Sequence, residues 1–289
     1  LPLVTAAGDV PALARAVIQA AATMKEEATW ASDLRSSLRY VLAAFAIAGG
    51  GDARRFVHAC EALRARFRDR GVRRGGTYER VAAAMLHVGG AERDPDVARM
   101  QRIYELMKQH HWWLTGPEDL PACALLTVHG DDPAGMPQRI EAIYQRLRDG
   151  GLGAGDGLQM ASHVLYLGHG SAADLAGRFL QLHAGFRDQG IRMWDCDRDE
   201  LAILCLLGED PARTIRTVTD HRERIRAELG HVGPVTSFSY ACGTAFLQAF
   251  AGRPIDDGLC RDLTVANLMM ATNAASLLQQ QRAAAASGA

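Results

Sequence analysis

The segment RFRDRGV, residues 66–72, closes an amphipathic run with a glycine followed by an apolar residue. Three further segments close in a similar way: RLRDGGL (146–152), GFRDQGI (185–191) and RAELGHV (226–232), the last with its apolar residue one place later. Their glycines, Gly71, Gly151, Gly190 and Gly230, stand 80, 39 and 40 residues apart, so one unit of about 40 residues repeats. A helix commonly ends where a glycine adopts the left-handed conformation and the next apolar residue packs back on the last turn. We therefore expect these glycines to end helices.

The gap of 80 residues holds two repeats, and in its middle His111 takes the place of the glycine. A second series of turns alternates with the first, and each follows a short apolar run. These turns are AGGGD (48–52), VGGAERDP (88–95), VHGDDP (128–133), LGHGS (167–171) and LGEDP (207–211). Their Asp-Pro pairs favour a new helix with the aspartate as N-cap and the proline in the first turn: Asp94-Pro95, Asp132-Pro133 and Asp210-Pro211.

Each unit therefore consists of a buried apolar helix A, a tight turn, and an amphipathic helix B that carries arginines. Six such hairpins are predicted over residues 30–70, 77–111, 118–150, 156–190, 198–230 and 236–282, after a first helix near 9–27. We predict an all-α fold in a single helical-repeat domain, residues 1–282, with a disordered tail, residues 283–289. Stacked hairpins favour a HEAT-like α-solenoid, and six hairpins could instead close an (α/α)6 toroid.

The composition limits the class of protein. Of 289 residues, 48% are hydrophobic and 22% are charged, and these ordinary values exclude wholesale disorder. Lysine occurs only at Lys25 and Lys108 while arginine is abundant, a bias typical of GC-rich bacterial coding. The formal net charge of −1 argues against a nucleic-acid partner, because such proteins usually carry a clear basic excess.

The cysteines and the start of the chain indicate a cytoplasmic protein. The six cysteines form no CxxC pair, and we expect them to be reduced thiols: Cys60, Cys123, Cys196, Cys205, Cys242 and Cys260. The first residues lack the charge and cleavage pattern of a signal peptide, and a chain that begins at Leu1 could lack its native N-terminus. No apolar stretch approaches the ~20 residues that a membrane span needs, so no membrane partner is expected.

Two stretches carry a resemblance to a known family. HHWWLTGPEDLPACALL (110–126) joins a His-aromatic-aromatic-Leu-Thr segment to an acidic pair and a Leu-Leu helix. One repeat later, GLGAGDGLQMASHVLYLG (151–168) carries a Gly-Asp-x-Leu-Gln element followed by Ser-His. In both stretches the sequence resembles an uncharacterised bacterial family that is catalogued only as a domain of unknown function. The resemblance covers about residues 30–250; it implies a helical fold and no particular reaction.

Polar residues gather at the starts of the predicted A helices. They are Asp33, Glu79, Glu118 with Asp119, Asp156 with Gln159, and Asp199 with Glu200. In a solenoid such positions line one edge of a groove, where they could bind a cationic or hydroxylated ligand. Carboxylates at helix N-termini also cap free backbone N–H groups, which contributes about 0.5–2 kcal/mol each without any function. Both interpretations stay open.

One helical face could carry chemistry. Asp156, Gln159 and His163 share a face at i, i+3 and i+7, and an aspartate there could orient the imidazole as in general-base sites. Asp119, Asp156 and His163 are therefore the candidate catalytic or metal-binding groups. A lone histidine on an apolar helix is, however, more often a hydrogen-bonded core residue. Zinc-protease, nucleophile-elbow and P-loop motifs are absent, and the other histidines lack zinc-site spacing, so no cofactor and no metal are predicted.

Two tryptophans in inter-helix linkers, Trp113 and Trp194, are expected to wall a groove. The predicted ligand-binding set is Trp113, Thr115, Asp119, Asp156, Gln159, His163 and Trp194. We predict a helical-repeat binding protein that holds a peptide, a protein or a small molecule in a groove lined by the third and fourth hairpins. The alternatives are an enzyme that uses Asp119, Asp156 and His163, and a HEAT-like nucleic-acid-binding protein.

Overall fold

The computed structural model describes residues 10–27, 33–48, 51–72, 75–110, 116–230, 232–250, 261–269 and 271–272. Within these ranges every regular element is helical and no strand occurs, which confirms the predicted all-α fold. The chain divides into two compact units: unit 1 comprises residues 1–105, 115–129 and 257–289, and unit 2 comprises residues 106–114 and 130–256. The expected extent of one domain, 1–282, stays a prediction, and the tail from residue 283 lies outside the described residues.

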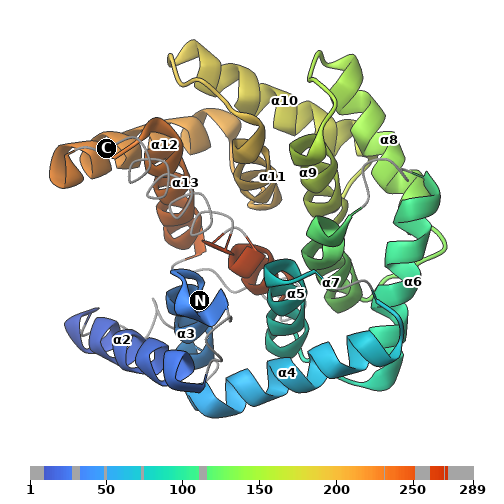
Figure 1. The fold of residues 1–289 in the computed structure, drawn as a ribbon. Coiled ribbons are helices and arrows are strands. Elements are labelled where there is room, and N and C mark those ends of the chain that lie inside the picture. Colours follow the sequence, from blue (N-terminus) through green and yellow to red (C-terminus); the bar gives the residue numbers. More distant parts are fainter. Residues whose placement is uncertain are drawn as a thin grey trace, which may run out of the picture. The chain divides into compact units, whose positions relative to one another are not determined.

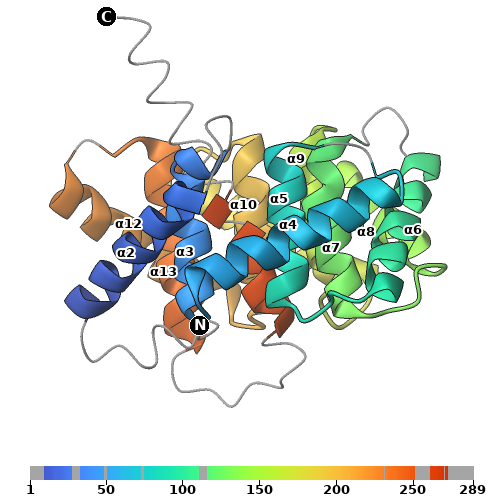
Figure 2. The same ribbon diagram turned by 60° about the horizontal axis from the view of Figure 1, so that its bottom comes forward.

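Unit 1 is built around two short apolar helices. Its elements are α2 (Val10–Glu27), η1 (Asp33–Arg35), α3 (Leu38–Ala48), α4 (Ala53–Asp69), α5 (Thr77–Val88), η2 (Pro117–Asp119) and α7 (Leu120–His129), and α6 (Asp94–His110) belongs to it as far as residue 105. Helix α2 packs against α3 and α4, α4 packs against α5, and α5 packs against α7 (Figure 2). Residues 120–128 of α7 are all buried, so other elements cover this helix on every face.

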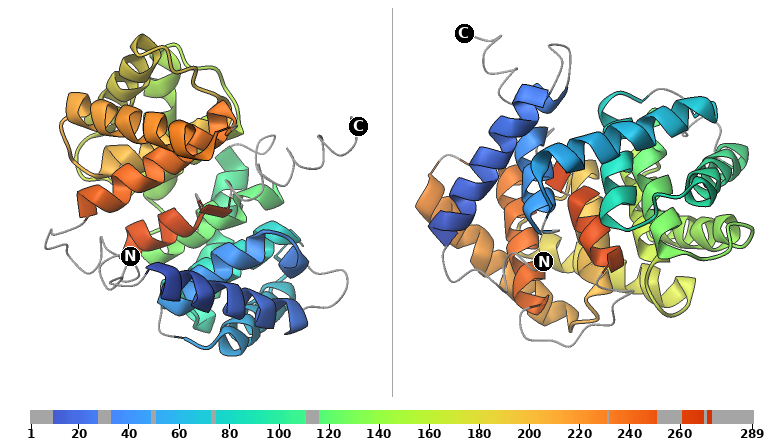
Figure 3. Two further views of the ribbon diagram at one scale, coloured as in Figure 1. Left: turned by 90° about the vertical axis from the view of Figure 1, so that its left-hand side faces the viewer. Right: turned by 90° about the horizontal axis from the view of Figure 1, so that it is seen from below.

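Unit 2 has the same alternation of helix types. Its elements are α8 (Met136–Asp149), α9 (Asp156–Tyr166), α10 (Ala172–Asp188), η3 (Asp195–Asp197), α11 (Arg198–Leu206), α12 (Pro211–Leu229) and α13 (Pro234–Phe250). The long helices α8, α10 and α12 lie side by side, and so do α9, α11 and α13 (Figure 1). Contacts of α8 with α9, α10 with α11 and α12 with α13 join the two layers, and Figure 3 shows the last pair in orange.

The glycine stops adopt the conformation that the sequence predicts. The backbone φ is 74° at Gly71, 90° at Gly151, 73° at Gly190 and 65° at Gly230. After Gly190, the N–H of Ile191 donates to the carbonyl of Phe186 at 3.0 Å, and Ile191 is buried against the last turn. Gly71 and Gly151 end α4 and α8 in the same way. His111, which stands in the glycine position of another repeat, lies outside the described residues.

The Asp-Pro pairs behave as predicted at one place and differently at two. Asp210 is the N-cap of α12, and its carboxylate accepts the backbone N–H of the third residue beyond it at 2.9 Å. Helix α6 instead begins at Asp94, and Asp96 accepts the N–H three residues before it at 2.9 Å. Asp132 accepts an N–H inside its own turn at 3.1 Å, and α8 begins only at Met136. At the first exception Asp96 accepts the N–H that precedes the helix, and at the second the helix begins four residues after the aspartate.

Among the described helices, none is both long enough and apolar enough to cross a membrane. Five cysteines fall within the described ranges, and each is a free thiol: Cys60, Cys123, Cys196, Cys205 and Cys242.

Two glycine substitutions in and after α10 should change stability in opposite directions. Gly190→Ala places a Cβ in the left-handed region and should lower the free energy of unfolding by about 1–2 kcal/mol. Gly177→Ala adds a methyl group where nothing lies within 4 Å, in mid-helix, and should raise it by about 0.5–1 kcal/mol. Urea unfolding followed by circular dichroism measures both, and a shift of the same sign in both variants would contradict the assignment of Gly190 as a helix stop.

Candidate functional site

The predicted site residues fall in different parts of the structure. Asp119 lies in unit 1, whereas Asp156, Gln159, His163 and Trp194 lie in unit 2. Trp113 and Thr115 lie outside the described residues. The geometry of the site can therefore be built from the unit 2 residues, and the groove along the third and fourth hairpins stays a prediction.

Asp119 is engaged in a local cap. It is 5% exposed at the end of η2, and its Oδ2 accepts the backbone N–H of Gly116 at 2.9 Å. Asp197 does the same at the end of η3, where its Oδ2 accepts the N–H of Trp194 at 2.8 Å. A carboxylate that reaches back to the start of its own turn satisfies a backbone donor that would otherwise be buried without a partner. Asp119 and Asp197 therefore act as caps, which is one of the two interpretations of the carboxylates at A-helix starts.

Glu79 joins the start of α5 to α4. Its Oε2 accepts the N–H of Gly75 at 3.3 Å, and its Oε1 lies 3.2 Å from Nε of Arg64. Arg80, 7% exposed at its side chain, pairs with Glu61 of α4, and the charges of Arg80 and Arg64 help to hold the pKa of Glu61 below its ordinary value despite partial burial. This network fixes one helix against another and accounts for a buried glutamate without a ligand.

The polar stripe of α9 divides between solvent and interior. Asp156 is exposed in the first turn, whereas Gln159 and His163 are 3% and 2% exposed. Ser162 is fully buried and donates its hydroxyl to the carbonyl of Leu158 at 2.8 Å. The shared face at i, i+3 and i+7 therefore runs from water into the core, and His163 sits where a core histidine is expected. Asp156 is the member of this stripe that a ligand in solution can reach.

The start of α9 is held tightly against η3. The N–H of Gly157 donates to Oδ2 of Asp195 at 3.1 Å, and a Cβ at position 157 would lie 2.1 Å from the carbonyl oxygen of Asp195. Arg198 donates to the carbonyl of Gly153 at 3.0 Å and pairs with Asp195 at 2.6 Å. These contacts bring the Gly155-Asp156-Gly157 turn and the segment that carries Trp194 into one surface, which we call the α9–η3 edge.

Trp194 is presented on the α9–η3 edge in a fixed position. Its side chain is 38% exposed, and Cζ of Arg192 lies 3.9 Å from the centre of its ring. A guanidinium over an indole face is attracted by the ring quadrupole. The Asp197 cap holds the Trp194 backbone at the same time, so both the main chain and the ring of this exposed tryptophan are restrained.

Three carboxyl groups lie beneath this edge in the interior of unit 2. Asp197, Asp199 and Glu200 are 1%, 4% and 1% exposed. Ser239 of α13 donates its hydroxyl to Oε1 of Glu200 at 2.8 Å, and the N–H of Glu200 donates to Oδ1 of Asp199 at 3.1 Å. This acid cluster connects η3 and α11 to α13.

Burial changes the protonation of the acid cluster. It raises the pKa of Asp197 to about 7, and the negative charge of Asp199 adds to this, while the N–H of Trp194 and the charge of Arg222 oppose it. Burial also raises the pKa of Glu200 well above its ordinary value, again with Asp199 contributing. A carboxyl group in an apolar surrounding favours its neutral form. Burial therefore shifts Glu200 toward its neutral form relative to a glutamate in water, an effect that no sequence motif indicates.

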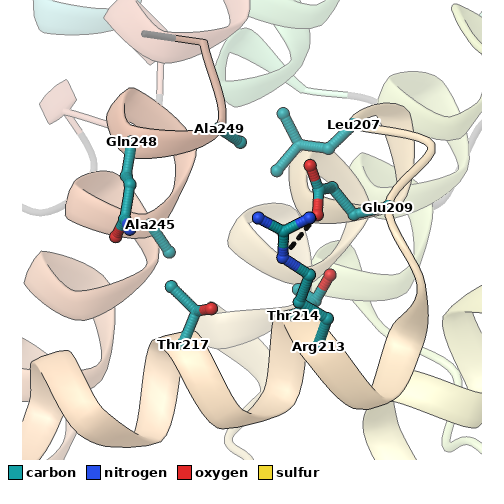
Figure 4. Close-up of a pocket in the computed structure, with 8 residues that line it drawn as sticks. All are labelled: Leu207, Glu209, Arg213, Thr214, Thr217, Ala245, Gln248 and Ala249. Carbon is teal, nitrogen blue, oxygen red and sulfur yellow. Dashed lines mark ion pairs between the residues drawn. The ribbon is translucent and has the colours of Figure 1, made fainter.

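Two further observations complete the survey of unit 2. No group of three or more histidine, cysteine, aspartate or glutamate side chains that could hold a metal ion occurs among the described residues. An open pocket with a cavity volume of about 50 Å³ lies between the end of α11, α12 and α13, and Glu209, Arg213 and Gln248 are among its lining residues (Figure 4). No sequence signal indicates this pocket, because its polar residues follow no motif and resemble an ordinary solvated helix face.

The comparisons with known proteins bear on the family. Residues 11–241 match the family described as "Protein of unknown function (DUF4003)". The chain belongs to this family. Part of it is also similar to the uncharacterized protein YeaA of Bacillus subtilis (strain 168), with 26% identity over 151 residues, which cover 51% of this chain and 46% of that protein. The chain thus spans about half the length of this curated relative. No solved structure matches the chain.

Gly157→Ala should disrupt the α9–η3 edge. The new Cβ would collide with the backbone carbonyl of Asp195, which cannot move as a side-chain tip can, so the free energy of unfolding should fall by about 1–3 kcal/mol. Gly153→Ala is the matched control, because nothing lies within 4 Å of a Cβ there, and it should change stability by no more than about 0.5 kcal/mol. Equal urea midpoints for the two variants would show that α9 and η3 do not touch as described.

The acid cluster should make stability depend on pH. The folded Asp197 and Glu200 keep protons that the unfolded chain releases at its ordinary pKa, so the folded state binds more protons and stability falls as pH rises from about 4 through 7. Glu200→Gln, which keeps a carbonyl acceptor for Ser239, should make the slope shallower by up to about 1.4 kcal/mol per pH unit. Urea unfolding at a series of pH values tests this against the exposed control Glu223→Gln; a wild-type slope in Glu200→Gln would mean that Glu200 is ionised.

Proposed function

We propose that this chain is a helical-repeat binding protein, with HEAT-like stacking of its A/B hairpins, that holds a peptide, a partner protein or a small molecule. The alternating packing of short apolar and long amphipathic helices within each unit supports this. A closed (α/α)6 arrangement is the alternative, and small-angle X-ray scattering distinguishes an open from a closed molecule. A cytoplasmic location is part of the proposal, and the free thiols of the described cysteines support it.

The observation that carries the proposal is the restrained, exposed Trp194. An indole that is 38% exposed leaves apolar surface in water, and its burial against a ligand would release that water. Tryptophan and arginine are enriched among the residues that carry most of the binding energy of interfaces. Because Arg192 and the Asp197 cap already hold the ring and the backbone, little conformational entropy remains to be lost on binding.

The groups around Trp194 suit a polar ligand. Asp156 offers an exposed carboxylate at the start of α9, and Arg192 offers an exposed guanidinium. Asp195 is already engaged by the N–H of Gly157 and by Arg198, so it fixes the edge and leaves recognition to its neighbours. An aromatic plane flanked by one acceptor and one donor of opposite charge fits a peptide segment or a small polar molecule. The Gly155-Asp156-Gly157 turn of this edge begins the fourth predicted hairpin, residues 156–190, and Trp194 lies in the linker between it and the fifth, residues 198–230.

The experiment compares one exposed aromatic residue with another. A library of peptides and metabolites is screened by thermal shift, and the compounds that stabilise the wild type are repeated with Trp194→Ala. Tyr40→Ala is the matched control, because Tyr40 is 42% exposed and also lies beneath an arginine, with Cζ of Arg39 at 4.5 Å from its ring centre. A ligand bound at the α9–η3 edge should raise the Tm of the wild type and of Tyr40→Ala. Its affinity for Trp194→Ala should be at least tenfold lower, a loss of about 1.4 kcal/mol in binding free energy.

Other outcomes favour the alternatives. Ligands that stabilise all three proteins equally would place binding away from Trp194 and contradict the proposal. Chemical turnover of a stabilising compound would favour an enzyme, with Asp119, Asp156 and His163 as the groups to test. Strong, salt-dependent retention on heparin would favour a nucleic-acid partner.

A further inference from the structure

Trp194 and Asp197 close a ring of two hydrogen bonds at the α9–η3 edge. The N–H of Trp194 donates to Oδ2 of Asp197 at 2.8 Å, and the N–H of Asp197 donates back to the carbonyl of Trp194 at 3.1 Å. Asp197 ends η3, which is a single turn of three residues. A turn this short can open locally while the helices beside it stay folded. The Asp197 carboxyl group therefore decides whether the backbone of Trp194 is held.

The same carboxyl group is incompletely satisfied in the interior. Asp197 is 1% exposed, and within the part of the chain that the structure describes its Oδ1 is buried and accepts no hydrogen bond. The negative charge of Asp199 acts on it, and Arg222 of α12 acts in the opposite sense. Nε of Arg222 is itself buried and has no hydrogen-bond partner among the described residues. A charged Asp197 is therefore costly in this place.

The other titratable groups near Asp197 add little charge to its surroundings. Asp195 of η3 is paired with Arg198 at 2.6 Å. Burial raises the pKa of Cys196 to about 11 and that of Cys242 of α13 well above its ordinary value, so both thiols are neutral. Helix α9, which also packs on η3, carries Asp156 in solvent and His163 in the core. The charges that act on Asp197 are those of Asp199 and Arg222.

The cap at η2 has the same geometry without the acidic neighbours. Asp119 ends η2 as Asp197 ends η3, and its Oδ2 accepts the N–H of Gly116 at 2.9 Å. Two and three residues beyond Asp119 stand Pro121 and Ala122, where the chain beyond η3 carries two acids. Acidic neighbours are therefore no requirement of the cap. Their presence at η3 makes one of two similar caps sensitive to charge.

The ionisation of Asp197 falls in the neutral range of pH. Burial, with the charge of Asp199 added, raises its pKa to about 7. When the turn opens, Asp197 enters water and its pKa returns to the ordinary value of about 4. The closed turn thus keeps a proton that the open turn releases, so a rise in pH favours the open turn.

We propose that the η3 turn is a pH-responsive device that holds Trp194 while Asp197 is protonated and releases it as Asp197 ionises. In the closed turn the proton resides on Oδ1, and Oδ2 keeps the N–H of Trp194. The open population rises from about pH 5 toward 7 and then stays level, because Asp197 is ionised in both states above that pH. The consequence for a ligand rests on the proposed function: binding at the edge weakens as pH rises, because a released Trp194 must be ordered again.

Amide hydrogen exchange, measured by NMR on the 15N-labelled protein without ligand, tests the device. The protection factor of the Trp194 amide, corrected for the intrinsic exchange rate at each pH, should fall by up to about tenfold per pH unit between about pH 5 and 7 and level off above. The amide of Leu204, buried in α11, should stay better protected at every pH, because the turn opens without the helix.

Three variants separate Asp197 from its neighbours. Asp197→Asn removes the ionisable group and keeps an oxygen for the N–H of Trp194, so protection of this amide should not change with pH. Asp199→Asn should move the midpoint to lower pH, because the charge of Asp199 helps to raise the pKa of Asp197. Asp188→Asn removes an exposed carboxylate at the end of α10; it is the matched control and should titrate as the wild type does.

The proposal is overturned if the protection of Trp194 does not depend on pH, or if Asp197→Asn titrates as the wild type does. It is also overturned if Trp194 and Leu204 are equally protected at every pH, because opening is then global unfolding. If Asp197→Asn folds poorly, the wild-type titration and Asp199→Asn still decide. No ligand takes part in this experiment, so its failure is distinct from a failure of the ligand comparison with Trp194→Ala.

Discussion

The structure depends on one constraint, the complete burial of the short A helices. Residues 120–128 of α7 are buried without exception, and α11 carries buried residues from Asp199 to Cys205. Such a helix has no solvent face, so it is stable only when neighbours cover all of its sides. In unit 2 the neighbours of α11 are α9 and α13 in its own layer and α10 in the other. This need for cover on all sides explains the amphipathic B helices. It also explains the glycines that end them, after which the chain turns back.

The same burial decides what the polar residues at the A-helix starts do. A carboxylate drawn into the interior with its helix must find a backbone N–H, an arginine or a proton. Asp119 finds the N–H of Gly116, Glu79 finds Arg64, and burial raises the pKa of Glu200 well above its ordinary value. The row of carboxylates that the sequence presents as a ligand-binding edge is therefore largely used within the fold. Asp156, which stays in solvent, is the exception on α9.

The sequence could predict what local chemistry determines, and no more. The stops at Gly71, Gly151 and Gly190 could be predicted from a glycine and one apolar residue. A helix that ends at a glycine in the left-handed conformation depends only on its own last turn. The Asp-Pro pairs failed as N-caps at Asp94, where Asp96 accepts the preceding N–H, and at Asp132, whose carboxylate accepts an N–H within its own turn. The contact of Gly157 with Asp195 joins residues 38 positions apart, and the pocket depends on how α12 approaches α13. No periodicity in one segment contains that information.

The edge proposed to bind a ligand and the pocket of unit 2 both lie at the ends of A helices, and packing explains why. The faces of these helices are occupied by neighbouring helices, so only their first and last turns reach solvent. The start of α9 and the turn before α11 form the edge that presents Trp194, and Leu207 and Glu209, which follow α11, line the pocket. Groups fixed at the ends of buried helices are held more rigidly than groups on loops, which favours binding without reorganisation. In this fold, the recognition chemistry is therefore expected at helix ends, while the stripes along the helices serve stability.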